Sequence, residues 1–211
     1  MHQPFATGPC AAGDTETAFS AGTRLPHLAG RGVEVRQVMA AHFLRACGEV
    51  IEIGGAGLPI TGFLTHRPQA VTVIDPKIAP FAAETLHGAP CQVRHLAAKL
   101  QAVPLAPRPG RYGLVLLGLS LKPFGAMPAI DDRLLRLAQG AAVIVIDYAL
   151  NLERAAMQVP TLLALEGFAV QVDLNLRLAD AALAGTGFAE RRFLVLEPAG
   201  AGADEERRRD A

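Results

Sequence analysis

The residues best suited to chemistry in this sequence form a turn of small residues. The turn reads Glu52-Ile53-Gly54-Gly55-Ala56-Gly57 and follows two apolar residues at positions 50 and 51. Glycines let the backbone approach a ligand closely and adopt positive φ. Where a strand enters such a turn and a helix leaves it, the free N–H groups of the helix can hold a polar ligand. The turn therefore predicts a ligand site at the end of a strand.

A second candidate is Asp75, which ends the β-branched run Ala70–Ile74. It lies about twenty residues after the turn, where parallel α/β folds place an acidic side chain that accepts hydrogen bonds from both ribose hydroxyls. The turn and Asp75 together indicate a cofactor that contains adenosine. NAD and S-adenosylmethionine both meet that condition.

Two details separate these cofactors. A dinucleotide places a pyrophosphate on the turn, which favours G-x-G-x-x-G, whereas Ile60 stands at the position of the third glycine here. Glu52 also lies two residues before Gly54. A carboxylate there would repel pyrophosphate but suits a cofactor with an ammonium and a sulfonium group. These residues favour S-adenosylmethionine.

The chain resembles the class I S-adenosylmethionine-dependent methyltransferases from about Val33 to Pro198. Their first motif, roughly acidic-x-Gly-x-Gly-x-Gly, stands here as Glu52–Leu58, with Ala56 and Leu58 in place of two glycines. The stretch Arg111–Leu119 is similar to the family's fourth-strand motif, with Gly113 where the family often has Asp. The ending Arg191–Pro198 is similar to the family's last, antiparallel strand.

The resemblance implies an α/β fold: a three-layer sandwich around a mostly parallel, seven-stranded, Rossmann-like sheet with an antiparallel last strand. It also implies that the turn and the ends of the second, third and fourth strands hold the cofactor. The cofactor-binding residues expected on that basis are Glu52, Gly54, Gly55, Ala56, Gly57, Asp75, Pro76, His95, Leu96 and Gly118. The family often has an acidic residue near adenine where this chain has His95 and Leu96.

In methyl transfer the cofactor supplies the reactive group, and the protein aligns the nucleophile and sometimes removes its proton. Substrate-facing residues are expected at the carboxyl ends of the fourth and fifth strands. The candidates there are Lys122, Asp147 and Tyr148. Lys122 could bind an anionic group or be a solvated loop lysine. Asp147 could orient or deprotonate the acceptor, or cap the following helix.

The composition limits the choice of partner. Twenty Lys and Arg balance twenty Asp and Glu, and no basic stripe of the kind that nucleic-acid binders carry is evident. A small-molecule substrate is therefore expected, and nucleic acid is not. No apolar run is long enough for a membrane span and no secretory signal is recognisable, which predicts a cytoplasmic protein. The three dispersed cysteines predict reduced thiols and no metal site.

The elements that must position these residues alternate along the chain. Helices are expected at Val33–Cys47, 58–67, Ile78–Leu86, Ile130–Gln139 and Leu152–Glu166, the first from the helical spacing of Val35, Val38, Met39, Phe43 and Leu44. Strands are expected at Glu49–Ile53, Ala70–Ile74, Gln92–His95, Leu114–Leu119, Ala141–Ile146, Ala169–Leu176 and Arg192–Leu196. Near-continuous apolar strands between helices indicate a parallel sheet covered on both faces.

The expected organisation is a flexible arm at 1–23, one domain at 24–198 and a disordered tail at 199–211. The expected function is methyl transfer from S-adenosylmethionine to an O or N atom of a small molecule. Two alternatives are an NAD-type oxidoreductase and a catalytically silent domain of the same fold that binds a cofactor or a partner. The altered glycines suit the silent domain. The oligomeric state, a homodimer included, is not determined by the sequence.

Overall fold

The computed structural model describes residues 31–54, 58–117, 132–150, 164–177, 179 and 189–199. Its helices are α1 (Arg31–Phe43) and α2 (Asp132–Gly140), with the 3₁₀ turns η2 (Ile60–Gly62) and η3 (Leu100–Ala102). Its strands are β1 (Glu49–Ile53), β2 (Ala70–Ile74), β3 (Phe81–Leu86), β4 (Ala89–Leu96), β5 (Tyr112–Leu117), β6 (Val143–Ala149), β7 (Phe168–Arg177) and β8 (Glu190–Pro198).

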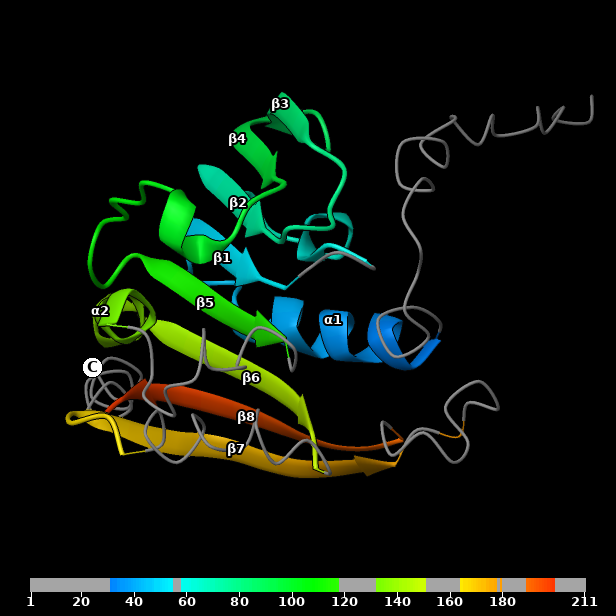
Figure 1. The fold of residues 1–211 in the computed structure, drawn as a ribbon, viewed down its shortest axis with the longest axis vertical. Coiled ribbons are helices and arrows are strands. Elements are labelled where there is room, and N and C mark those ends of the chain that lie inside the picture. The colour runs from blue at the N-terminus through cyan, green and yellow to red at the C-terminus, as the bar shows by residue number, and fades with distance from the viewer. Residues whose placement is uncertain are drawn as a thin grey trace, which may run out of the picture.

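All eight strands form one sheet in the order β3-β4-β2-β1-β5-β6-β8-β7, with β3 at one edge and β7 at the other (Figure 1). The five strands from β4 to β6 in this order are parallel to one another. Strand β3 is antiparallel to β4, β8 is antiparallel to β6, and β7 is antiparallel to β8. The mostly parallel, Rossmann-like sheet with an antiparallel last strand is therefore confirmed.

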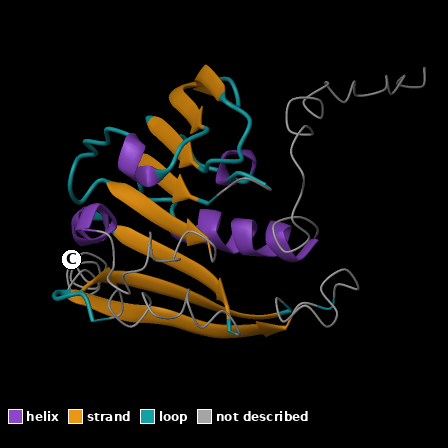
Figure 2. Ribbon diagram, viewed as in Figure 1, coloured by secondary structure: helices purple, strands orange, loops and turns teal. Residues whose placement is uncertain are grey.

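The two faces of the sheet form two separate apolar clusters. In β1, Val50 packs with α1 and η2, whereas Ile51 and Ile53 pack with α2 and η3. The alternation follows from the period of two residues in a strand. Because both faces are covered, the central strands carry apolar residues at nearly every position, as in the fully buried β6. Strands outnumber helices in the described part of the chain (Figure 2).

The helix expected at Ile78–Leu86 is wrong, and this segment supplies an eighth strand. Residues 81–86 form β3, which pairs antiparallel with β4. The two strands are joined by His87 and Gly88, both with positive φ (50° and 74°). Two consecutive residues of this kind make the tight turn whose twist matches a β-hairpin. Pairing with β4 thus overrides the local helix preference of the Ala, Glu and Leu residues in this segment.

The helix expected at 58–67 is also wrong, because only the three-residue η2 forms there. Pro59 precedes η2, and the backbone N–H of Ile60 donates to the carboxylate of Glu52. The start of this segment is therefore fixed by a side chain of β1. Gly62 and Pro68 disfavour continuation as an α-helix.

Helix α1 presents a different face to the sheet from the one expected. Val35 and Val38 are exposed (54% and 58%), whereas Arg36 and Gln37 are buried (3% and 1%) together with Ala40, Ala41 and Leu44. The polar pair lies inside because two buried carboxylates of the sheet contact it, as shown below. The helix expected at Ile130–Gln139 is confirmed as α2.

Several expectations lie outside the described residues. These are most of the helix at Leu152–Glu166, the arm at 1–23, and the tail at 199–211 apart from its first residue. Within the described residues, none of the helices has the length and apolar character that a membrane span requires.

Candidate functional site

The carboxyl ends of the central parallel strands meet at one edge of the sheet. Ile53 of β1 is level with Ile74 of β2 and Leu116 of β5, and Leu116 is level with Ile146 of β6. The residues that follow these positions therefore lie at one edge, where the arrowheads of β1, β5 and β6 point the same way in Figure 1. This is the edge at which α/β sheets of this type bind ligands.

Gly54 begins the predicted turn at this edge. Its φ is 99°, in the left-handed region that favours glycine. Its N–H donates to the carbonyl oxygen of Ile74 at 2.9 Å, which ties the start of the turn to the end of β2. Gly55, Ala56 and Gly57 lie outside the described residues. The structure thus explains the first glycine by its backbone conformation.

Glu52 is fully buried on the α1 side of β1. Its Oε1 accepts a hydrogen bond from Gln37 Nε2 at 2.6 Å, and its Oε2 accepts one from the backbone N–H of Ile60 at 2.8 Å. Burial raises the pKa of Glu52 to about 7, the nearby charge of Asp75 adds to the shift, and the two hydrogen bonds oppose it. One oxygen of Glu52 therefore holds Gln37 of α1, and the other holds Ile60, which follows the turn.

Asp75 lies directly beside Gly54, at the end of the adjoining strand. Its Oδ1 accepts a hydrogen bond from the backbone N–H of Lys77 at 2.7 Å, so the side chain also shapes the turn that follows β2. Asp75 is half-buried and Pro76 is exposed. Asp75 thus places a carboxylate, a hydrogen-bond acceptor, at the carboxyl end of β2.

His95 and Leu96 point to opposite faces of β4. The ring of His95 is buried, its Nε2 lies 2.9 Å from the hydroxyl of Thr61 in η2, and its centroid is 5.2 Å from that of Phe81. Burial lowers the pKa of His95. Leu96 is half-buried and packs against the cluster on the α2 side. The two neighbours therefore do not form one contact surface.

Asp147 lies at the end of β6 in a buried cluster with two arginines. Its Oδ2 is 2.6 Å from Arg36 Nε of α1. Its Oδ1 and Oδ2 each accept a hydrogen bond of 2.8 Å from Arg191 of β8. All three side chains are at most 3% exposed. With both oxygens held by guanidinium groups, Asp147 fixes α1 and β8 to the end of β6.

Tyr148 points to the other face of the sheet. It is 4% exposed, and its hydroxyl accepts a hydrogen bond from Arg192 at 3.3 Å. Arg192 in turn forms a two-point ion pair with Asp173 of β7. Lys122 and Gly118 lie outside the described residues.

Sequence reasoning missed Arg36, Gln37 and Arg191. The available signal was the pair of adjacent polar residues Arg36 and Gln37 between two valines, but the helical spacing of Val35 and Val38 suggested the opposite face. Only the position of the two carboxylates shows why the polar pair is buried.

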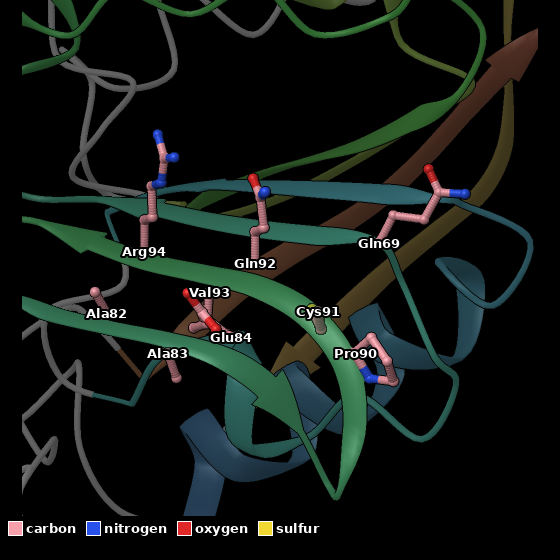
Figure 3. A pocket seen from close by; sticks show the side chains of 9 residues that line it. All are labelled: Gln69, Ala82, Ala83, Glu84, Pro90, Cys91, Gln92, Val93 and Arg94. Carbon is pink, nitrogen blue, oxygen red and sulfur yellow. The ribbon is translucent and has the colours of Figure 1, made fainter.

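A hollow of about 750 Å³ lies away from this edge, over β3 and β4. Gln69, Gln92 and Arg94 are among the side chains that line it (Figure 3). None of the predicted site residues lines it. Within the described residues, no group of three or more His, Cys, Asp or Glu side chains is arranged to hold a metal ion.

No protein-family model and no curated protein matches the sequence. Solved structures do match the fold. The N-methyltransferase NodS from Bradyrhizobium japonicum WM9 superposes with a TM-score of 0.53 at 14% identity, over 80% of this chain and 95% of NodS. Its complex with S-adenosyl-L-homocysteine gives a TM-score of 0.52 at 14% identity, over 80% and 86% of the two chains.

The 23S rRNA methyltransferase ErmE also matches, with a TM-score of 0.46 at 17% identity over 84% of this chain and 73% of ErmE. The prediction that excluded nucleic acid as a partner is corrected by the presence of RNA methyltransferases among the matches. Balanced overall charge does not report how charge is distributed over a surface, so it excludes neither class of substrate. In strand order and strand direction, this chain has the fold of the class I S-adenosylmethionine-dependent methyltransferases.

Proposed function

We propose that this protein is an S-adenosylmethionine-dependent methyltransferase whose cofactor binds across the carboxyl ends of β1 and β2. The observation that carries the proposal is the pairing of Gly54 and Asp75 at adjacent strand ends. Gly54 has the positive φ of a ligand-binding turn, and its N–H is bonded to the residue just before Asp75. The complex of NodS with S-adenosyl-L-homocysteine supports this choice of cofactor.

Each described residue at this edge has a role in the proposal. Asp75 accepts the ribose hydroxyls through its carboxylate oxygens. Glu52 holds Gln37 of α1 and Ile60, which follows the turn. Pro76, His95 and Leu96 remain predicted neighbours of the adenosine. Gly55, Ala56, Gly57 and Gly118 keep the roles that the sequence predicts.

The proposed chemistry needs little from the protein at the reacting atoms. The bound cofactor supplies an activated methyl group, and the protein aligns the acceptor. Asp147 is unsuited to removing a proton from the acceptor, because Arg36 and Arg191 hold both of its oxygens in a buried ion cluster. We therefore assign Asp147 to holding α1. Tyr148 is also buried, and its hydroxyl is bonded to Arg192, so of the three candidates Lys122 is left for contact with the acceptor.

Calorimetric titration tests the proposal. S-adenosylhomocysteine should bind and NADH should not. Asp75→Ala should weaken binding at least about fivefold, because two hydrogen bonds of about 0.5–1.5 kcal/mol each are lost. Asp173→Ala is a matched control, since it removes a carboxylate from the distant edge strand β7. Binding of NADH alone, or an unchanged affinity in Asp75→Ala, would contradict the proposal.

A further inference from the structure

Gln37 bridges the two sides of the glycine turn. Its side-chain Nε2 donates to Glu52 Oε1 at 2.6 Å, before the turn, and to the carbonyl oxygen of Leu58 at 2.7 Å, after it. An amide nitrogen has two N–H donors, so this geometry uses both. The side chain is 1% exposed. A single buried amide thus fixes the separation of the two ends of the turn.

Glu52 adds the third bond of this clamp, in which its Oε2 accepts the N–H of Ile60 at 2.8 Å. The bonds from Gln37 to Glu52 and from Glu52 to Ile60 thus link the two residues that flank segment 53–59 to each other and to α1. Gly54 is held separately by its bond to the carbonyl oxygen of Ile74. The described residues on either side of the turn, Gly54, Leu58 and Ile60, are therefore held by side chains from α1 and β1 and by the end of β2.

The neighbouring residue keeps Gln37 in place. Arg36 lies 2.6 Å from the carboxylate of Asp147, which Arg191 also holds. Adjacent residues of α1 are therefore fixed to the ends of β6 and β1. Rotation of α1 would break both contacts and leave charged groups buried without partners, which costs several kcal/mol.

The remaining polar atom of Gln37 argues against a role in stability alone. Its Oε1 is buried and has no hydrogen-bond partner among the described residues. A buried acceptor without a donor lowers stability, so this arrangement is not the one that packing alone would favour.

We propose that Gln37 is a positioning residue that holds Glu52 and Leu58, on either side of the glycine turn, at the separation that favours cofactor binding. The inference rests on the proposed function. It predicts that loss of the amide weakens cofactor binding by more than the accompanying loss of stability can explain, because Glu52 and Leu58 must then be brought into place when the ligand binds.

The test compares Gln37→Met with Tyr112→Phe by calorimetry with S-adenosylhomocysteine and by thermal unfolding. Met conserves volume and removes both donors. Tyr112→Phe removes a buried hydrogen bond to the carbonyl oxygen of Leu137, on the α2 side of the sheet. Gln37→Met should raise Kd at least tenfold. Tyr112→Phe should leave Kd within twofold even where both variants lose similar stability.

Gln37→Glu gives a readout that a purely structural role would not move. A protonated carboxyl at position 37 has one O–H donor where the amide has two N–H donors, so it can hold only one of the two acceptors, and the ionised form can hold neither. Relative to wild type at each pH, its Kd should therefore be closer to the wild-type value at pH 6 than at pH 8.5, where it should be at least tenfold weaker. This variant also serves if Gln37→Met does not fold.

The outcomes separate the two proposals. If wild type does not bind S-adenosylhomocysteine, the proposed function fails and this inference fails with it. If wild type binds and the Gln37 variants bind equally well at both pH values, only the inference is overturned. The same holds if Tyr112→Phe weakens binding as much as Gln37→Met does.

Discussion

The buried carboxylates of Glu52 and Asp147, near the ends of β1 and β6, are stabilised in different ways. Glu52 is buried against an uncharged amide and a backbone N–H, whereas Asp147 is buried against two guanidinium groups. An ionised carboxylate in an apolar interior is costly unless it is paired and hydrogen-bonded. Asp147 is compensated by opposite charge. Glu52 has only dipoles, so its pKa rises instead.

The stability of the protein should depend strongly on Asp147. Asp147→Asn leaves Arg36 and Arg191 buried without their counter-charge, which should lower the free energy of unfolding by about 3–5 kcal/mol. The matched control is Asp173→Asn, which removes the carboxylate of an exposed two-point Asp–Arg pair and should cost about 0–1 kcal/mol. Urea unfolding measures both. Equal losses in the free energy of unfolding would show that the buried Asp147 cluster is no more important for stability than the exposed Asp173–Arg192 pair.

The raised pKa of Glu52 predicts a particular pH dependence of stability. The ordinary pKa of a glutamate is 4.5 and that of Glu52 in the folded protein is about 7, so between these pH values the folded state binds more protons than the unfolded state. The stability that the raised pKa of Glu52 contributes is fully present below pH 4.5 and is lost as the pH rises through about 7. At 1.36 kcal/mol per pKa unit, the loss is about 3 kcal/mol.

Comparison with Glu52→Gln isolates this contribution. The variant carries no titratable group at this position, although its amide places a donor against Gln37 or Ile60. Urea unfolding from pH 4.5 to pH 8 should show the advantage of wild type over the variant shrinking by about 3 kcal/mol. A constant difference across this range would mean that Glu52 ionises normally in the folded protein.

At the scale of elements, the contact between α1 and β5 accounts for one departure from the family motif. Gly113 of β5 stands where the family often has Asp. A Cβ atom at this position would lie 2.1 Å from Leu44 Cδ2 and 3.0 Å from Cys47 Sγ. Both of these side chains are buried. The glycine is therefore explained by close packing of the segment after α1 on the sheet.

Gly113→Ala should accordingly destabilise the protein by about 1–3 kcal/mol, the usual cost of overpacking a core. Gly62→Ala is the control, because no heavy atom lies within 4 Å of a Cβ atom built there. Its effect should be small or slightly stabilising, since alanine restricts the unfolded chain. Thermal unfolding of the two variants checks both values. A neutral Gly113→Ala would show that Leu44 can move aside freely.

The β3–β4 hairpin is the element that most changes the expected architecture. In place of a helix between β2 and β4, the chain adds an antiparallel strand and extends the sheet at its edge. The five strands from β4 to β6 in the sheet order remain parallel to one another, and their carboxyl ends still meet at one edge. The hairpin therefore alters the outer part of the sheet and leaves the geometry of Gly54 and Asp75 intact.

At the scale of the whole molecule, the sheet divides into a centre and two edges. Strands β1 and β5 have hydrogen-bonded neighbours on both sides and apolar clusters on both faces. Strand β3 pairs with a neighbour on one side, and its side chains are mostly exposed. Local stability should follow this order, because buried contacts and paired backbone groups resist opening.

Hydrogen exchange measured by mass spectrometry tests this order. Peptides from β1 and β5 should exchange at the rate set by global unfolding, and peptides from β3 should exchange faster by at least tenfold. Binding of S-adenosylhomocysteine should slow exchange around Gly54 and Asp75 and leave β3 unchanged. Protection of β3 equal to that of β1 would show that the hairpin unfolds only with the whole domain.

Much of the fold follows from local sequence patterns. Apolar runs predicted β1, β2, β5, β6, β7 and β8, and the order of strands and helices predicted the parallel core. The positions of Gly54 and Asp75 at neighbouring strand ends also follow, because parallel strands in register carry their ends to one edge. These features depend on residues close together in sequence or on a simple period.

The partners of Glu52 and Asp147 depended on tertiary structure. The sequence placed a carboxylate at the end of each strand, but it could not show that Gln37 and Arg36 of α1 would meet them, or that Val35 and Val38 would face outward. The spacing of apolar residues marks the buried face of a helix only where the surface that the helix packs against is also apolar. Here the burial of Arg36 and Gln37 is decided by carboxylates at residue separations of 15 for Glu52 and over 100 for Asp147, so only the assembled sheet determines which face of α1 lies inside.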